Sequence, residues 1–271
     1  MKKRIGALAL TITALLLLTV SAGAITWGEP DGDAHRYVGT LLFVQNGVSY
    51  YSCTGTLLSP TVMLTAGHCV EEYGNTNDVT YVRFAEDALE GRGDYASTQQ
   101  WLRKEWIQAK RVIPHPQFDD FAEFPLTYDV GLVILSKPVR LKEYGVLPDE
   151  GFLETLGSKD DRFTVVGYGM QGIINPFYQD DYARYVGHVS LVELNSTFAG
   201  GASAKFTNNP GGGNGSGGTC FGDSGGPVFH GDTRTIGAIV SWGITPCIGV
   251  DYQFRMDTAT ALDFVRAYLK R

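Results

Sequence analysis

Short runs rich in Val, Ile, Tyr and Phe recur along the chain, separated by turns that contain glycine, proline and asparagine. Such runs predict β-strands, and many of them at turn-marked spacing are typical of all-β sandwiches or barrels. With 271 residues and 44% hydrophobic content, the chain can bury one large core or two smaller ones. The predicted strands are Tyr37–Val44, Val48–Leu57, Val62–Thr65, Val79–Phe84, Arg111–Ile113, Val130–Leu135, Phe163–Tyr168, Gly187–Leu194, Pro227–Phe229, Ile236–Trp242 and Tyr252–Met256.

Helical signal is scarce and is concentrated at the C-terminus. From Asp257 to Arg271 apolar residues recur at helical spacing, and Asp257 or Thr258 could cap the first turn. The stretch from Ala199 to Gly218 is crowded with glycine, asparagine and serine, and we expect it to be a loop. It lacks the Lys-Ser/Thr pair of a phosphate-binding loop, so a flexible surface insertion is the favoured interpretation.

The N-terminus has the pattern of a cleaved secretory signal. Basic residues at 2–4 precede the apolar run Ile5–Val20, and small residues follow up to Ala24. We therefore expect cleavage near Ala24, a secreted (extracellular or periplasmic) protein and no stable membrane anchor. Cleavage would remove three positive charges and change the formal charge from −7 to −10. Such an acidic chain disfavours nucleic acid as a partner.

Four cysteines, Cys53, Cys69, Cys220 and Cys247, predict disulfides in an exported chain. Four cysteines allow three connectivities. Pairing neighbours in sequence would close two modest loops, each beside a segment with catalytic potential. A zinc site is the competing interpretation, but the chain has no Cys-x-x-Cys pair, so we expect no metal.

The segment from Thr219 to Pro227 places Ser224 in a glycine-flanked turn beside a cysteine and the acid Asp223. A serine hydroxyl needs a base to accept its proton, an acid to orient that base, and donors for an oxyanion. The same segment also fits the Gly-x-Ser-x-Gly turn of α/β-hydrolases. That fold requires the acid and the base after the serine, and only His230 follows Ser224, so chain order excludes it.

Two other segments could supply the base and the acid. His68 follows an apolar strand and small residues, and Cys69 could fix its turn. Asp129 directly precedes the apolar strand 130–135, where an unpartnered carboxylate would be costly to bury. The other histidines have no comparable setting; for example, His115 lies between two prolines and suits a structural role.

Taken together, these segments resemble those of trypsin/chymotrypsin-type serine endopeptidases. The matching stretches are 55–60, 65–69, 129–132, 220–227 and 241–243, in the family's order. The resemblance implies two six-stranded antiparallel β-barrels with a C-terminal helix. It places His68 and Asp129 in an N-terminal barrel (25–140) and Ser224 in a C-terminal barrel (141–271), after a signal peptide (1–24).

The resemblance also implies a role for each of these residues. Ser224 would attack the peptide carbonyl, His68 would act as the general base and Asp129 would orient His68. The backbone N–H groups of Gly222 and Ser224 would hold the oxyanion. Ser241 would support Asp129, and the stretch from Ser241 to Gly243 would pair with substrate backbone.

The mature N-terminus suggests a mode of activation. In the resembled family a freshly exposed Ile-Val-Gly-Gly terminus inserts its α-amino group beside the acid that precedes the nucleophile. Here Ile25-Thr26-Trp27-Gly28 follows the expected signal cleavage site. We expect signal cleavage itself to free Ile25, whose ammonium would pair with Asp223. The alternative is an ordinary N-terminal strand with Asp223 satisfied by other groups.

Substrate preference is predicted from five positions. The resemblance places Gly218 at the base of the specificity pocket and Gly243 and Gly249 on its walls, and we expect Thr219 to contact substrate as well. An open, uncharged pocket favours large apolar or aromatic residues before the scissile bond. A pocket-facing Asp251 would instead favour Lys or Arg, although we expect Asp251 to be a solvent-facing strand residue.

The resulting prediction is a monomeric, secreted serine endopeptidase that acts on proteins or peptides. The chemistry needs no cofactor, and no acidic loop has the spacing of a calcium site. The non-enzyme alternative is a protease-like binding module that has lost activity, because a fold does not determine function. The presence of His68, Asp129, Ser224 and Gly222 argues against that alternative.

Overall fold

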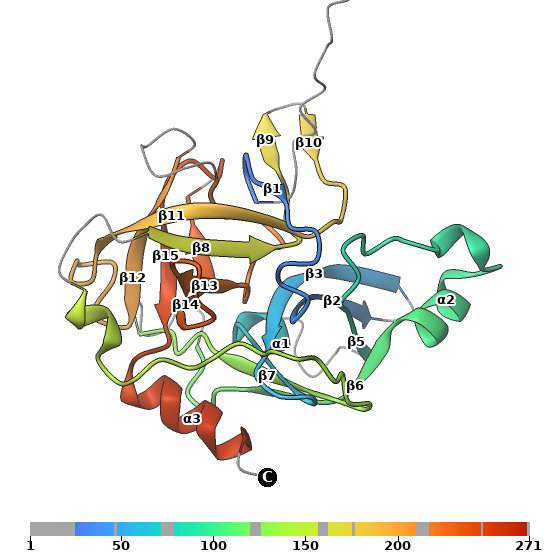
Figure 1. The fold of residues 1–271 in the computed structure, drawn as a ribbon, viewed down its shortest axis with the longest axis horizontal. Helices are drawn as coiled ribbons and strands as arrows, with labels where there is room; N and C mark the ends of the chain where they lie inside the picture. Colours follow the sequence, from blue (N-terminus) through green and yellow to red (C-terminus); the bar gives the residue numbers. More distant parts are fainter. Residues whose placement is uncertain are drawn as a thin grey trace, which may run out of the picture.

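The computed structural model describes residues 25–45, 48–71, 79–119, 126–156, 162–174, 177–209, 217–244 and 246–269. The predicted signal peptide (1–24) and the glycine-rich stretch 210–216 lie outside the described residues. Two β-barrels lie side by side, one built from the first half of the chain and one from the second (Figure 1). The predicted all-β fold of two six-stranded antiparallel barrels with a C-terminal helix is confirmed.

The N-terminal barrel closes in the order β2-β3-β4-β7-β6-β5, with every pairing antiparallel. Apolar side chains pack into one core here, and β2, β4 and β7 are buried along nearly their whole length. Its strands are β2 (Val38–Gln45), β3 (Val48–Leu57), β4 (Val62–Thr65), β5 (Val79–Arg83), β6 (Ile107–Pro114) and β7 (Gly131–Leu135).

The C-terminal barrel closes through the pairing of β8 with β11, and the remaining strands follow in the order β12-β15-β14-β13. A separate cluster of buried apolar side chains, including Phe163, Phe206 and Val228, fills this barrel. Its strands are β8 (Arg162–Gly167), β11 (Tyr185–Glu193), β12 (Ser203–Asn208), β13 (Pro227–His230), β14 (Ile236–Gly243) and β15 (Gly249–Arg255).

The remaining elements are short. A two-residue strand, β1, pairs with β11, and β9 pairs with β10 as a hairpin. They are β1 (Glu29–Pro30), β9 (Gly172–Ile174), β10 (Phe177–Gln179), α1 (His68–Glu71), α2 (Thr98–Glu105), α3 (Ala259–Leu269) and the 3-10 turns η2 (Arg92–Asp94) and η3 (Phe152–Thr155).

One sequence prediction about local structure was wrong and another is narrowed to one of its alternatives. The stretch 199–218 is not all loop, because residues 203–208 form the strand β12 between β11 and β15. Of the two predicted caps of the C-terminal helix, Thr258 is the one found, because its hydroxyl accepts the N–H of Ala261. Asp257 is instead buried, where it pairs with Arg255 and accepts the N–H of Leu153.

A buried arginine joins the two barrels. The Nε of Arg184 donates to Asp31 at 2.7 Å, and its other nitrogens donate to the Tyr168 hydroxyl and to the carbonyl oxygens of Val38 and Gly32. Asp31 lies just after β1, whereas Val38 begins β2 of the N-terminal barrel. The contact therefore ties the segment between β1 and β2 to the C-terminal barrel.

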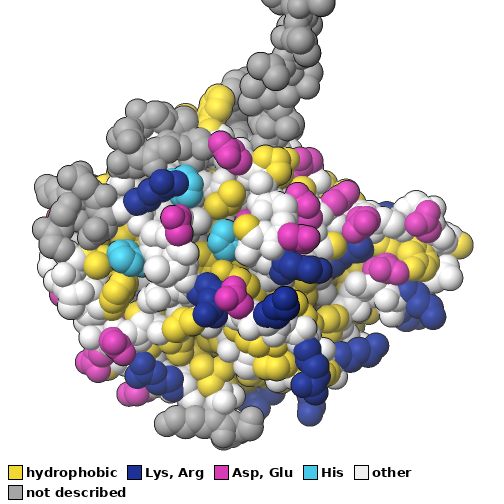
Figure 2. Space-filling model, in the orientation of Figure 1, with side chains coloured by type: hydrophobic (Ala, Val, Ile, Leu, Met, Phe, Trp, Pro, Cys, Tyr) yellow, Lys and Arg dark blue, Asp and Glu magenta, His cyan; other side chains and the backbone are white. Residues whose placement is uncertain are grey.

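The surface carries both signs of charge. On the face shown in Figure 2, acidic and basic side chains are intermixed, with hydrophobic side chains reaching the surface among them. Within the described ranges, no helix has the length and apolar content needed to cross a lipid bilayer.

Candidate active site

The turn that carries Ser224 depends on two glycines. Gly222 has φ +100 and Gly225 has φ +77, values that side chains on L-residues rarely allow. A Cβ on Gly225 would also collide with Thr65 and with backbone atoms of the N-terminal barrel. The nucleophile turn can therefore press directly against the neighbouring barrel, which carries His68.

His68 and Asp129 form a close pair. The Nδ1 of His68 lies 3.0 Å from Asp129 Oδ2, and the backbone N–H of His68 donates to Asp129 Oδ1 at 2.9 Å. Ser241, on β14 of the other barrel, donates its hydroxyl to Asp129 Oδ2 at 2.5 Å. Burial by itself would raise the pKa of Asp129, but the charge of His68 and these hydrogen bonds outweigh it and lower the pKa.

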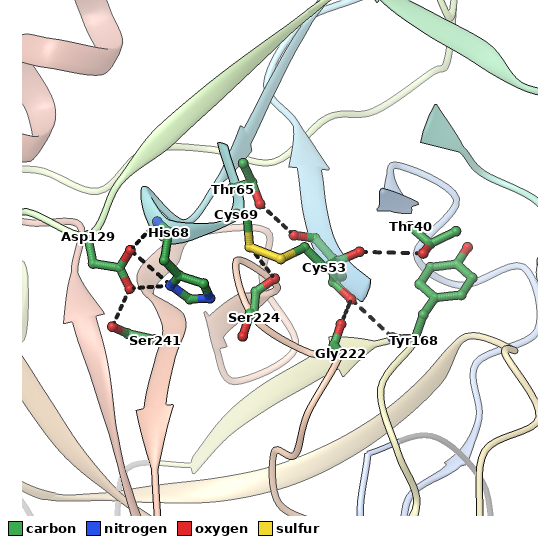
Figure 3. Close-up of a disulfide and its surroundings, with 11 residues drawn as sticks. Thr40, Cys53, Thr65, His68, Cys69, Asp129, Tyr168, Gly222, Ser224 and Ser241 are labelled. Atoms are coloured by element: carbon green, nitrogen blue, oxygen red, sulfur yellow. Dashed lines mark hydrogen bonds and ion pairs between the residues drawn. A yellow bond between two sulfur atoms is a disulfide. The ribbon is translucent and has the colours of Figure 1, made fainter. Parts of the chain in front are cut away.

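The imidazole of His68 lies between Asp129 and Ser224, with its far nitrogen on the side of Ser224 (Figure 3). Its position at the start of α1 is fixed by the disulfide of the next residue, Cys69, to Cys53 of β3. The second disulfide joins Cys220 to Cys247, so the pairing of sequence neighbours is the one found. The first disulfide therefore holds the segment next to His68, and the second holds the segment that leads to Ser224.

Thr54 connects the nucleophile turn to the N-terminal barrel. Its hydroxyl donates to the carbonyl oxygen of Gly222 at 2.9 Å and accepts the N–H of Tyr168 at 3.1 Å, while its own N–H donates to the carbonyl oxygen of Ser224. Within the described residues, the N–H groups of Gly222 and Ser224 donate to no protein acceptor. Two backbone donors are therefore left available beside the Ser224 hydroxyl.

The expected pocket residues gather around a buried carboxylate. Gly218 packs against the side chain of Asn208, and Gly243 lies opposite Asp251 in the pairing of β14 with β15. Asp251 accepts hydrogen bonds from Asn208 Nδ2 at 2.6 Å and from the Thr219 hydroxyl. The expectation that Asp251 faces solvent was wrong, because only 3% of its surface is exposed.

The environment of Asp251 changes its titration. Burial raises its pKa to about 6, although the hydrogen bonds from Thr219 and Asn208 lower it in part. The carboxyl group can therefore gain or lose a proton within the physiological range. The sequence did not identify Asn208 as a site residue, because its role depends on the register of β12 against β15.

Two other predicted binding residues, Trp242 and Gly249, lie near the end of β14 and at the start of β15. Trp242 stacks on Tyr252, with ring centroids 4.1 Å apart, and Gly249 begins β15 with φ +106. Several large apolar side chains of this barrel are more than half exposed, namely Phe198, Phe221 and Ile248.

Asp223 and Ile25 are both fully buried in the C-terminal barrel. The carboxylate of Asp223 accepts the N–H groups of Gly169 at 2.8 Å and Cys220 at 2.9 Å. Burial nevertheless raises the pKa of Asp223 to about 8. The Ile25 side chain joins the barrel core, and the next residue, Thr26, donates its N–H to the carbonyl oxygen of Gly218.

One group of potential metal ligands appears in the described part of the chain. Atoms of Cys53, His68 and Cys69 lie within 4.8 Å of one another. The two sulfur atoms are joined in a disulfide, so they cannot act as thiolate ligands. His115 is buried and stacks on Tyr128, in keeping with a structural role.

The chain is similar in sequence to several serine proteases of one family. Chymotrypsin-like elastase family member 1 of Homo sapiens is 27% identical over 192 residues, which cover 70% of this chain and 68% of that protein. Its counterpart in Macaca fascicularis is also 27% identical over 192 residues, with 66% of the relative covered. The CLIP domain-containing serine protease B15 of Anopheles gambiae is 28% identical over 231 residues, covering 81% of this chain and 62% of the relative.

The matched regions therefore span about two thirds of the length of these curated relatives. A solved structure of HL collagenase shares the fold, with a TM-score of 0.67 at 19% identity, and covers 91% of this chain and 99% of its own. The family model described as Trypsin matches residues 25–265. The chain thus belongs to the trypsin family, the trypsin/chymotrypsin-type serine endopeptidases.

Proposed function

We propose that the protein hydrolyses peptide bonds with Ser224 as nucleophile, His68 as general base and Asp129 as the residue that orients His68. The observation that carries the proposal is the buried pairing of Asp129 with His68 Nδ1 at 3.0 Å, on the barrel facing the Ser224 turn. A carboxylate in this position holds the proton on Nδ1 and leaves Nε2 to accept one.

The proposed reaction forms and then hydrolyses an acyl-enzyme. As the Ser224 oxygen attacks the substrate carbonyl, His68 takes the hydroxyl proton, and the N–H groups of Gly222 and Ser224 stabilise the oxyanion. His68 then donates that proton to the leaving amine, and the C–N bond breaks. In the second half water attacks the ester and loses a proton to His68, which passes this proton to the Ser224 oxygen as the ester C–O bond breaks and the acid product leaves.

We propose that substrates bind as extended peptides along the stretch from Ser241 to Gly243. Residues 241–243 lie beyond the part of β14 that pairs with β13, so substrate backbone would be added there as a further strand. The exposed Phe198, Phe221 and Ile248 would provide apolar contact for neighbouring substrate side chains. Protein or peptide substrates, rather than nucleic acids, fit this surface, and we expect the enzyme to act as a monomer.

For primary specificity, we propose a pocket that accepts large side chains. Glycine at 218, 243 and 249 leaves space for large apolar or aromatic residues. The buried Asp251 supports a second preference, for Lys or Arg, when its carboxyl group is ionised. The two preferences are therefore linked through the protonation of one side chain.

We further propose that signal cleavage after Ala24 creates the active terminus. Thr26 already donates to Gly218, and Ile25 already fills the barrel that contains Asp223. A freed Ile25 ammonium would give the buried Asp223 a positive partner. Export is supported by the two disulfides, since such bonds persist in oxidising compartments.

A peptide library digested by the protein processed at Ile25 tests the proposed function, with Ser224→Ala as the matched control. We expect cleavage after large residues by the wild type and none by the variant. Equal cleavage by both proteins would show that the activity does not depend on Ser224. The absence of cleavage by either protein would support the inactive binding module.

A further inference from the structure

A buried amide lies between the proposed catalytic pair and the expected specificity pocket. Gln253 belongs to β15, and only 2% of its surface is exposed. Its Oε1 accepts the backbone N–H of Ser241 at 2.8 Å, and its Nε2 donates to the Thr219 hydroxyl at 3.1 Å. The side chain therefore bonds one residue that contacts Asp129 and one that contacts Asp251.

The contact with Ser241 arises from an irregularity in the sheet. Between the regular pairings of β14 with β15 on either side, β14 has two residues, Val240 and Ser241, where β15 has only Gln253. Such a bulge takes a residue of the longer strand out of the regular ladder. An N–H that is left outside the ladder needs another acceptor, and the Gln253 side chain supplies one for Ser241. This bond holds the backbone of Ser241 in place.

Ser241 extends the contact to the proposed catalytic pair. Its hydroxyl donates to Asp129 Oδ2 at 2.5 Å, and Asp129 in turn holds Nδ1 of His68 (Figure 3). A short side chain such as serine reaches a fixed carboxylate only when the backbone that carries it is correctly placed. The hydrogen bond that Gln253 accepts from Ser241 therefore helps to orient the Ser241 hydroxyl toward Asp129.

The direction of these hydrogen bonds follows from the groups involved. The backbone N–H of Ser241 is a donor, so the oxygen of the Gln253 amide faces it and the NH2 group faces Thr219. The Thr219 oxygen accepts that bond and donates its own proton to Asp251. The series of contacts therefore reaches from the catalytic pair to the acid of the pocket.

We propose that Gln253 is a positioning residue of the peptidase, which orients the Ser241 hydroxyl toward Asp129 and connects this contact to Asp251 through Thr219. It acts on catalysis through Ser241, and on the choice between basic and aromatic substrates through Thr219. The proposal rests on the proposed function, because Asp129 and Asp251 have the roles given to them only if the protein hydrolyses peptides.

Kinetics of the processed protein test the role in catalysis. Gln253→Met keeps the length of the side chain but removes both hydrogen bonds. For a peptide with Phe before the scissile bond, we expect kcat to fall about tenfold and KM to change less than about twofold. Gln253→Glu keeps an acceptor for the Ser241 N–H and should recover most of kcat, because burial keeps the new carboxyl group neutral. The control Gln171→Met removes a similarly buried amide that bonds Asp181, and kcat should not change.

A double-mutant cycle shows whether Gln253 acts through Ser241. Ser241→Ala keeps the backbone N–H and removes only the hydroxyl, so adding Gln253→Met should lower kcat by no more than about twofold. The full loss in that background, or wild-type kcat in Gln253→Met alone, overturns the positioning role. Urea unfolding checks that each variant is folded at the assay temperature. If Gln253→Met is not, Gln253→Asn, whose side chain is one carbon shorter, replaces it.

The connection to Asp251 is measured by the ratio of kcat/KM for Lys and Phe substrates. Linked hydrogen bonds polarise one another, so Thr219 stabilises the ionised Asp251 more strongly while Gln253 donates to its oxygen. We expect Gln253→Met to lower the ratio about twofold at pH 6, near the pKa of Asp251. In Thr219→Val, which lacks the hydroxyl, the same change should leave the ratio unaltered. Equal effects in both backgrounds overturn this connection.

Ser224→Ala in the same assay separates this proposal from the proposed function. Cleavage that survives Ser224→Ala, or no cleavage by the wild type, overturns the proposed function and the role of Gln253 with it. Cleavage that is abolished in Ser224→Ala but unaffected in Gln253→Met overturns the role of Gln253 alone.

Discussion

The hydroxyl of Thr54 donates a 2.9 Å hydrogen bond to the carbonyl oxygen of Gly222. Thr54 belongs to the N-terminal barrel, and Gly222 precedes Ser224, the proposed nucleophile, by two residues in the C-terminal half of the chain. The bond orients the peptide unit between Gly222 and Asp223, which adjoins the N–H of Gly222, one of the proposed oxyanion donors. It thereby links the alignment of the nucleophile turn to the barrel that carries His68.

Replacing Thr54 by Val should therefore impair both stability and catalysis. The change removes the donor to Gly222 and the acceptor for the Tyr168 N–H, leaving two buried groups unpaired. We expect the free energy of unfolding to fall by about 1–3 kcal/mol and kcat to fall with it. Urea unfolding and peptide hydrolysis measure the two effects.

The chain offers a matched control on the same strand. The hydroxyl of Thr56 is buried and has no hydrogen-bond partner in the described part of the chain. Thr56→Val should therefore cost little or be stabilising, and Thr54→Ser should retain the contact. A loss of stability in Thr56→Val as large as in Thr54→Val would contradict the role given to the Thr54 hydroxyl.

The preference between basic and aromatic substrates should depend on pH. Burial raises the pKa of Asp251 to about 6, so the side chain becomes negative as the pH rises through that value. The ratio of kcat/KM for a Lys substrate to that for a Phe substrate should rise between pH 5 and pH 7. Taking the ratio cancels the titration of groups that affect both substrates equally.

In Asp251→Asn the same ratio should stay low and flat across this range. A ratio that does not change with pH in the wild type would remove Asp251 from the specificity pocket. Such a result would leave the open glycine-lined pocket, with a preference for large apolar residues, as the better account.

The stability of the unprocessed protein should fall with rising pH. Burial raises the pKa of Asp223 to about 8, against about 3.9 for an unfolded chain. Between these values the folded state holds a proton that the unfolded state has lost, so the free energy of unfolding decreases as pH increases. Well above pH 8 the carboxyl group is ionised in both states, so the free energy of unfolding no longer decreases on account of Asp223.

Freeing Ile25 should remove that dependence, because its ammonium would stabilise the ionised carboxylate and lower the pKa of Asp223. Thermal unfolding of protein beginning at Ile25, compared with protein carrying two additional N-terminal residues, measures the difference from pH 5 to pH 8. Asp223→Asn in the extended form should lose the same part of the pH dependence, while the contributions of other groups such as Asp251 remain. Identical profiles for the two wild-type forms, or full activity in the extended form, would argue against the pairing.

Removing the disulfide between Cys53 and Cys69 should affect the site as well as the fold. The two residues are 16 apart in sequence, and a loop of this size is worth about 3 kcal/mol in the chain-entropy description. The double variant to Ala should unfold at lower urea and lose activity, because Cys69 fixes the turn of His68. Activity equal to that of the wild type at a temperature where the variant is fully folded would contradict the second effect.

The fold could be predicted from sequence because most strands are either continuously apolar or alternate between apolar and polar residues. The strand Ser203–Asn208 was missed, since its composition merges with the glycine-rich stretch that follows. Helix α2 was also missed, because six of its eight residues are polar or charged and only Trp101 and Leu102 are buried. Both elements form because tertiary packing outweighs weak local preference.

The proposed catalytic residues were identified because their neighbours have recognisable patterns around His68, Asp129 and Ser224. Thr54 and Asn208 were not, since an isolated Thr or Asn in a strand resembles many others. Their contacts arise only when the barrels close and β12 takes its register beside β15. The prediction that Asp251 faces solvent was wrong for the same reason. The sequence of β15 does not show which of its residues lie opposite Gly243 in β14.

The most direct test of the central claim is covalent labelling of protein processed at Ile25 with an organophosphorus reagent, followed by peptide mass spectrometry. The account predicts a single phosphonylated residue, Ser224, labelled in step with the loss of peptidase activity, and strongly slowed labelling in His68→Ala. Failure to label Ser224 in folded, processed protein, or labelling at an undiminished rate in His68→Ala, would contradict it.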